Sequence, residues 1–98
     1  MVEAYAIKLR NETSLLLNLA YELFSTAAEL AATGQSEEAI LSYDEVVARF
    51  GNSDVGDLQE VVAFALFNKG IILGELKKPE DAVAAYNRGL ILLGKSKK

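Results

Sequence analysis

Apolar side chains between residues 14 and 33 recur at steps of three and four residues. The positions on this face are Leu16, Leu19, Leu23, Ala27 and Leu30. Steps of this length place side chains on one side of an α-helix, so the pattern predicts a helix over 14–33. A later segment, 57–77, repeats the face with Ala63, Leu66, Gly70 and Leu73. It predicts a second helix of the same kind.

Two further segments, 37–50 and 79–93, show the same periodicity. The apolar face of the first comprises Ala39, Tyr43, Val46, Val47 and Phe50. The face of the second comprises Ala82, Tyr86, Gly89, Leu90 and Leu93. No segment alternates apolar and polar residues in the manner of a β-strand. The chain is therefore expected to be all-α, with four helices.

Polar residues mark where these helices should begin. Ser36 is expected to cap the helix that starts at 37, because its hydroxyl can accept a hydrogen bond from a free backbone N–H. Asp57 with Glu60 forms a candidate capping pair at the next start. Pro79 suits the first position of the last helix, where its missing N–H is not needed.

Glycines mark where the second helix of each pair should end. Gly51 and Gly94 follow the last apolar positions, where a helix often ends in a left-handed residue. The segment 52–56 after Gly51 is polar and is expected to be a linker.

The chain contains an internal repeat. Shifting it by 43 residues aligns 14–51 with 57–94 without gaps, and nine of the 38 aligned positions are identical. The identical pairs are Leu15/Leu58, Ala20/Ala63, Leu23/Leu66, Phe24/Phe67, Leu30/Leu73, Glu37/Glu80, Ala39/Ala82, Tyr43/Tyr86 and Gly51/Gly94. A period of this length is typical of stacked helical units, none of which can bury its apolar face alone.

The spacing of small and aromatic residues within the units is specific. The second unit carries Asn68-Lys69-Gly70, Leu73, Ala82, Tyr86 and Leu90, and the first matches it with Ala27, Leu30, Ala39 and Tyr43. This set resembles the signature of the tetratricopeptide repeat (TPR) family, although the family's usual period is about 34 residues. The resemblance implies antiparallel helix hairpins stacked as a short α-solenoid, with repeats at 14–51 and 57–94, a linker at 52–56 and a basic tail at 95–98.

Residues 1–13 do not align with the repeat. Tyr5 and Leu9 have the spacing of Tyr86 and Leu90, which suits the remnant of a preceding second helix. The segment could equally run without a break into the helix at 14. The sequence leaves both interpretations open.

A second apolar stripe lies beside the core face of each first helix. It comprises Tyr21, Phe24 and Ala28 in one unit and Phe64, Phe67 and Ile71 in the other. In the TPR family these positions line a concave groove that holds a peptide, so the resemblance implies a partner-binding groove with Ser25, Asn68 and Glu75 as its polar residues. The alternative is that the rings belong to the core or pack against the N-terminal segment.

The last helix carries four consecutive apolar residues, Leu90, Ile91, Leu92 and Leu93. At about 100° per residue they cover nearly the whole circumference of a helix. Repeat arrays usually end in a polar capping helix, and none follows here. We therefore expect these residues to mediate self-association, by dimerisation or by exchange of a hairpin; the alternative is a monomer with a few exposed leucines.

Composition excludes several functions. The 98 residues include no cysteine and no histidine, so zinc sites built on them are impossible and the commonest general base is missing. The net charge of −4 argues against a nucleic-acid ligand, and no apolar run is long enough to cross a membrane. Acidic pairs fall at helix starts, where the helix dipole explains them without catalysis.

Together these patterns predict a non-catalytic scaffold that binds a protein or peptide and self-associates, without cofactor or metal. The absence of cysteine permits a cytoplasmic location. The alternative function is a structural or assembly fragment of a longer repeat array, natural or designed, with no ligand of its own.

Overall fold

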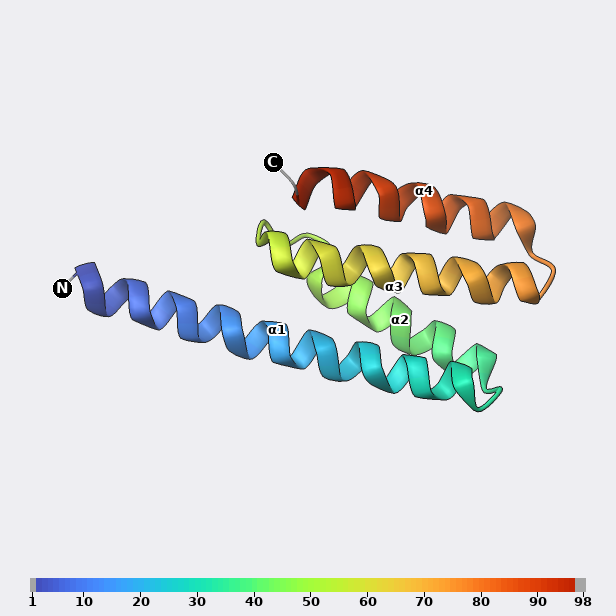
Figure 1. The fold of residues 1–98 in the computed structure, drawn as a ribbon, viewed down its shortest axis with the longest axis horizontal. Helices are drawn as coiled ribbons and strands as arrows, with labels where there is room; N and C mark the ends of the chain where they lie inside the picture. Colours follow the sequence, from blue (N-terminus) through green and yellow to red (C-terminus); the bar gives the residue numbers. More distant parts are fainter. Residues whose placement is uncertain (1, 97–98) are drawn as a thin grey trace.

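Four helices follow one another along the chain in the computed structural model, which describes residues 2–96 except for the side chains at 2, 5 and 9 (Figure 1). They are α1 (Val2–Ala32), α2 (Ser36–Phe50), α3 (Gly56–Glu75) and α4 (Pro79–Ser96). No strand occurs within the described residues. The prediction of an all-α chain with four helices is confirmed.

Each helix packs antiparallel against the next, which gives two hairpins, α1–α2 and α3–α4. The hairpins are stacked through contacts of α2 and α1 with α3. Helix α3 therefore contacts all three other helices, whereas within the described residues the backbone of α4 approaches α3 closely and no other helix. Ile40 of α2 packs against the side-chain cluster that α3 and α4 form. The expected stack of antiparallel hairpins is confirmed.

The turn between α1 and α2 closes with a left-handed glycine. Gly34 has φ 80°, and its N–H donates to the carbonyl of Ala31 at 3.1 Å. The N–H of Gln35 donates to the carbonyl of Leu30 at 2.8 Å. This pair of bonds is the Schellman motif, which satisfies the last carbonyls of a helix.

The turn between α3 and α4 repeats this geometry with a different residue. Lys77, 43 positions after Gly34, has φ 63°. Its N–H donates to the carbonyl of Gly74 at 3.0 Å, and that of Lys78 donates to Leu73 at 2.8 Å. The sequence repeat thus extends to the backbone hydrogen bonds, even where glycine is replaced by a side chain that disfavours positive φ.

The helix starts differ from the capping predictions, except at Pro79, which begins α4 as expected. Ser36 is the first residue of α2, the cap position is Gln35, and no side chain caps the helix. Helix α3 begins one residue before Asp57, with Val55 at the cap position and again no side-chain cap. The prediction of Ser36 and Asp57 as caps is therefore wrong, because each lies inside the first turn.

Ser53 organises the loop between the hairpins instead. Its hydroxyl accepts a hydrogen bond from the N–H of Val55 at 3.1 Å, and its carbonyl accepts one from the side chain of Gln59 at 3.0 Å. These bonds hold the chain against the first turn of α3.

Neither glycine expected at a left-handed helix end adopts that conformation. Gly51 has φ −63° and ψ −22°, and its N–H continues the helical pattern by donating to Val47 at 2.8 Å. Gly94 lies inside α4, which runs to Ser96. Both predictions are wrong: the left-handed residues lie at the other end of the stack, in the turns within the hairpins.

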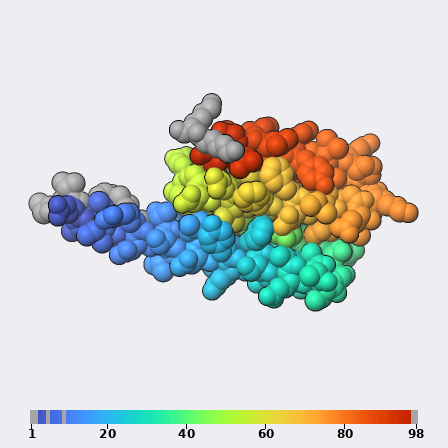
Figure 2. All heavy atoms as spheres, viewed as in Figure 1, coloured from blue at the N-terminus to red at the C-terminus, as the bar shows by residue number. Residues whose placement is uncertain are grey.

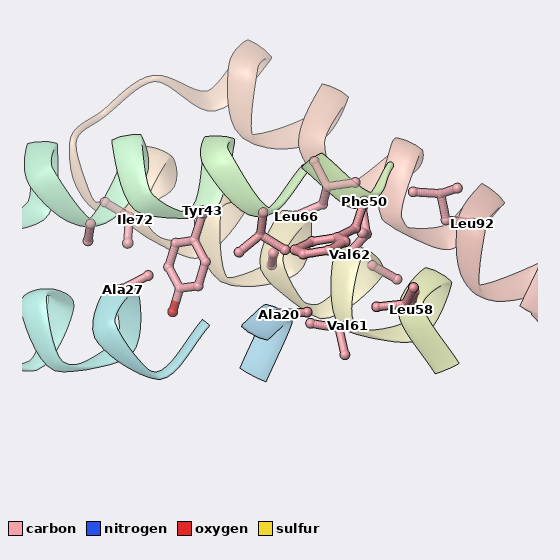
Figure 3. Packing of buried hydrophobic residues seen from close by; sticks show 14 residues of the cluster. Ala20, Ala27, Tyr43, Phe50, Leu58, Val61, Val62, Leu66, Ile72 and Leu92 are labelled. Atoms are coloured by element: carbon pink, nitrogen blue, oxygen red, sulfur yellow. The ribbon is translucent and has the colours of Figure 1, made fainter. Parts of the chain in front are cut away.

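The core consists mainly of small and β-branched side chains around one tyrosine (Figure 3). Its buried members are Ala20, Ala27, Ala39, Tyr43, Val46, Phe50, Leu58, Val61, Val62, Ala63, Ala65, Leu66, Ile72 and Leu92. Leu73, Ala82 and Ala85 form a smaller cluster between α3 and α4. No charged or polar side chain is buried within the described residues. Burial of apolar area is therefore the main force holding the helices together.

Two glycines bring α3 and α4 close together. A Cβ on Gly70 would lie 2.7 Å from Cε1 of Tyr86, and one on Gly89 would lie 2.6 Å from Cε1 of Phe67. Each aromatic ring thus packs directly against the backbone of the opposite helix. Ala27 and Val46 occupy the equivalent positions in the first hairpin.

Helix α1 is longer than α3, its counterpart in the repeat. Its start shows how the N-terminal segment joins the first helix. It runs unbroken from Val2 to Ala32, so residues 2–13 continue the first helix. This extension projects beyond the other helices (Figure 2), and the first buried residue among the described side chains of α1 is Ala20. It contributes much of the 55 Å length of the molecule.

Candidate functional site

The candidate groove lies where α1 and α3 run side by side in the same direction. Tyr21 of α1, with Phe64 and Ile71 of α3, are each about half exposed. All three belong to the stripe that the sequence predicts as partner-binding. An apolar surface spread over two neighbouring helices is typical of protein-interaction sites.

A first depression separates Tyr21 from Phe64. It encloses about 120 Å³ and is lined by Tyr21, Phe24, Glu60, Val61 and Phe64. Four of these five residues are apolar or aromatic, and Glu60 supplies the one charge. A single large apolar side chain of a partner fits a hollow of this size and character.

A second depression, of about 350 Å³, follows along the same two helices and reaches α2. It is lined by Ala28, Ala31, Ala32, Tyr43, Asn68, Ile71, Ile72 and Glu75. The three alanines of α1 form a flat wall because they have no side chain beyond Cβ. The polar atoms are those of the Tyr43 hydroxyl, Asn68 and Glu75, so the hollow is apolar with a few polar groups.

Phe24 and Phe67 are partly buried and pack against the core. The Phe24 ring makes an edge contact with Tyr43, with centroids 5.6 Å apart. Phe67 makes an edge contact with Phe64, at 6.1 Å, and packs against Gly89. Phe24 thus lines the first depression. Phe67 packs against Phe64 but lines neither depression.

Two polar contacts fix the register of α2 against α3 beside the second depression. The Asn68 side-chain N–H donates to the Tyr43 hydroxyl at 3.1 Å. The Lys69 ammonium lies 2.5 Å from a carboxylate oxygen of Asp44, with both side chains partly exposed. Asn68 therefore holds the wall of the groove in place, and one of its two amide N–H groups is already engaged.

The structure brings together most of the residues that the sequence nominates for the groove. Seven of the nine line the two depressions, namely Tyr21, Phe24, Ala28, Phe64, Asn68, Ile71 and Glu75. Ser25 is exposed and lines neither, as does the partly buried Phe67. Sequence reasoning did not nominate the other six lining residues, which are Ala31, Ala32, Tyr43, Glu60, Val61 and Ile72. Spacing offered a signal for Glu60 and Ala32, because each lies one turn from a nominated residue, Phe64 and Ala28.

The four residues nominated for self-association do not share one face. Leu90 and Ile91 are 59% and 61% exposed, whereas Leu92 is buried in the core cluster and Leu93 is partly buried against it. Only the first two are available to a partner.

Other chemistry is sparse. Within residues 2–96, no group of three acidic side chains comes close enough together to hold a metal ion. None of the helices there combines the length and apolar content needed to span a bilayer. A further depression of about 390 Å³ lies between α2, α3 and α4, and its charged lining residues are Lys69, Asp81 and Arg88.

No protein-family model, curated protein or solved structure matches the chain.

Proposed function

We propose that the chain is a non-catalytic, TPR-like scaffold that binds a peptide or protein segment in the groove between α1 and α3. The observation that carries the proposal is the placement of Tyr21, Phe64 and Ile71, which are about half exposed beside two apolar depressions. The repeat that resembles the TPR family supports it, because that family uses the same face.

The chemistry of the groove suggests what the partner carries. Aromatic and large apolar side chains contribute most of the binding energy at protein interfaces, because they bury a large area and lose little side-chain entropy. The charged lining residues, Glu60 and Glu75, are both acidic. A segment with two apolar side chains, one for each depression, and a nearby basic residue fits this surface.

The proposal can be tested by selecting peptides from a random library on the immobilised protein. Selection on the wild type should enrich sequences with aromatic or aliphatic residues and a basic residue. Phe64→Glu should weaken binding of the selected peptides at least about tenfold, since loss of one central anchor costs about 2 kcal/mol or more. NMR chemical-shift changes on peptide addition should map to α1 and α3.

Leu41→Glu provides a matched control. Leu41 is 69% exposed, lies on α2 and lines none of the described depressions, so its substitution should leave both binding and helicity unchanged. Circular dichroism should show that Phe64→Glu remains folded. Equal enrichment on the wild type and on Phe64→Glu would contradict the proposed groove.

A second candidate function is structural: a unit of a larger helical assembly. The exposed apolar face of α4 favours it, because Val83, Leu90 and Ile91 are each more than half exposed.

A further inference from the structure

The two outer faces of the helical stack differ in character. On α2, Ile40 and Val47 are partly buried and pack against the core. Their equivalents on α4, 43 residues later, are Val83 and Leu90, which are 55% and 59% exposed, and Ile91 beside them is 61% exposed. The last helix thus presents to solvent the face that its repeat counterpart buries.

Helix α1 has no matching apolar face for α4 to cover. The positions at which α3 carries Ala65, Lys69, Ile72 and Leu76 are occupied in α1 by Glu22, Thr26, Glu29 and Thr33. Ala65 and Ile72 are buried. If α4 docked on α1 of a second copy as α2 docks on α3, Glu22 and Glu29 would take the buried positions of Ala65 and Ile72, and removing two carboxylates from water costs free energy. Head-to-tail stacking of copies is therefore disfavoured.

We propose that two copies associate through α4, packed antiparallel on α4 of the second copy about a two-fold axis at Asn87. With the axis there, Val83 of one copy lies opposite Ile91 of the other, and the small Ala84 lies opposite Leu90. An interface about a two-fold axis must complement itself in this way. Asn87, which is exposed, meets its own counterpart, and a side-chain amide can both donate and accept a hydrogen bond.

The charges along α4 favour the antiparallel arrangement. Glu80 and Asp81 lie in its first turn and Lys95 lies in its last. An antiparallel pair brings each acidic end beside the basic end of the other copy, and it also places the positive end of each helix dipole beside the negative end of the other. A parallel pair would place like charges together at both ends.

This interface lies on α4, apart from the groove between α1 and α3, so the inference does not depend on the proposed function. One pair of helices buries a small area for an interface, which places the dimer in the weak class with a dissociation constant in the micromolar range. The fraction of dimer should therefore change over micromolar protein concentrations, which ordinary measurements cover.

Sedimentation velocity over a concentration series tests the proposal. The wild type should move from the monomer mass toward twice that mass and stop there, and Leu90→Glu should raise the dissociation constant at least about tenfold. Leu41→Glu, which introduces the same charge at a more exposed leucine on α2, should dimerise like the wild type. A monomer at every concentration would overturn the proposal, as would growth beyond two copies, which head-to-tail stacking predicts.

Cross-linking tests the position of the axis without disturbing the apolar residues. The chain has no cysteine, so Asn87→Cys introduces a single thiol. Mild oxidation should link the Asn87→Cys protein into a dimer, because residues on the axis are close enough for a disulfide, whereas Leu41→Cys should stay monomeric. Glu80→Lys should weaken the dimer, and adding Lys95→Glu to it should restore the wild-type constant. Equal cross-linking at positions 41 and 87, or no recovery in the double variant, would overturn this geometry.

Discussion

The two hairpins place identical residues in different surroundings. Leu58 at the start of α3 is 1% exposed, whereas Leu15, its repeat equivalent on α1, is 68% exposed. Helix α3 contacts all three other helices, whereas α1 lies at the edge of the stack. Near the far end of α4, Leu92 belongs to the same core cluster as Leu58, and its equivalent on α2 is Arg49, which pairs with Glu45 at the surface. The position of a leucine in the stack, rather than its residue type, therefore determines how much it contributes to stability.

The largest expected effect is the difference in stability between truncating Leu58 and truncating its equivalent, Leu15. Leu58→Ala should lower the free energy of unfolding by about 2–5 kcal/mol, because it leaves a cavity in the core. Leu15→Ala should change it by less than about 0.5 kcal/mol, because the side chain is mostly in water. Urea denaturation of both variants measures the difference. Equal losses would mean that α1 is as deeply packed as α3.

The hairpins also differ in how closely their helices approach each other. Gly89→Val tests this difference, because Val46 is the equivalent residue in the first hairpin. The new Cβ would meet the Phe67 ring and lie 3.0 Å from the carbonyl oxygen of Ala63, so we expect a loss of about 1–3 kcal/mol. Gly74→Ala is the control. Its Cβ meets no atom within 4 Å, so it should gain up to about 1 kcal/mol through helix propensity. A stable Gly89→Val protein would contradict the close approach of α3 and α4.

A smaller difference is expected at the two equivalent tyrosines. Tyr43→Phe removes the hydroxyl that accepts the Asn68 hydrogen bond, and it should cost about 1 kcal/mol of stability. Tyr86→Phe should be nearly neutral, because the described residues form no hydrogen bond with that hydroxyl. Thermal unfolding of the two variants side by side makes the comparison. If both variants lost the same free energy of unfolding, the hydrogen bond between Asn68 and Tyr43 would not be what stabilises the wild type.

The smallest expected effect is a gain. Lys77→Gly restores at the second turn the residue that the first turn uses, and it should stabilise the chain by about 0.5–1 kcal/mol because glycine tolerates φ 63°. The reverse change, Gly34→Ala, should cost a similar amount. Guanidinium denaturation resolves differences of this size when the slopes agree. A destabilised Lys77→Gly protein would show that the Lys77 side chain has a stabilising role of its own.

Periodicity predicted the helices and the stacking because both depend on which side of a helix is apolar. The start of α4 at Pro79 was predicted correctly because proline fits the first position of a helix. The cap predictions failed because a capping residue must lie one position before the helix, whereas Ser36 is the first residue of α2 and Asp57 the second of α3. The repeat aligns Ser36 with Pro79, and both are the first residue of their helix.

The groove was partly predictable for a related reason. A stripe on one helix nominated Tyr21, Phe64 and Ile71, but only the packing of the helices shows which side chains lie beneath them. Phe67 falls on the same stripe, yet it is turned toward α4 because Gly89 leaves room for its ring. Leu92 and Leu93 likewise face the core, which four consecutive apolar residues could not reveal.

The extension of α1 has a consequence for how the chain orders itself. Residues 2–13 form about three turns of helix, and the side chains described there are nearly all exposed. Short helices without tertiary contacts are only marginally stable in water. Amide protons of these turns should exchange with solvent soon after dilution into deuterium oxide, whereas those beyond Ala20 should persist as long as the core does. The longest helix of the molecule thus contains both its earliest-melting segment and one of its most protected.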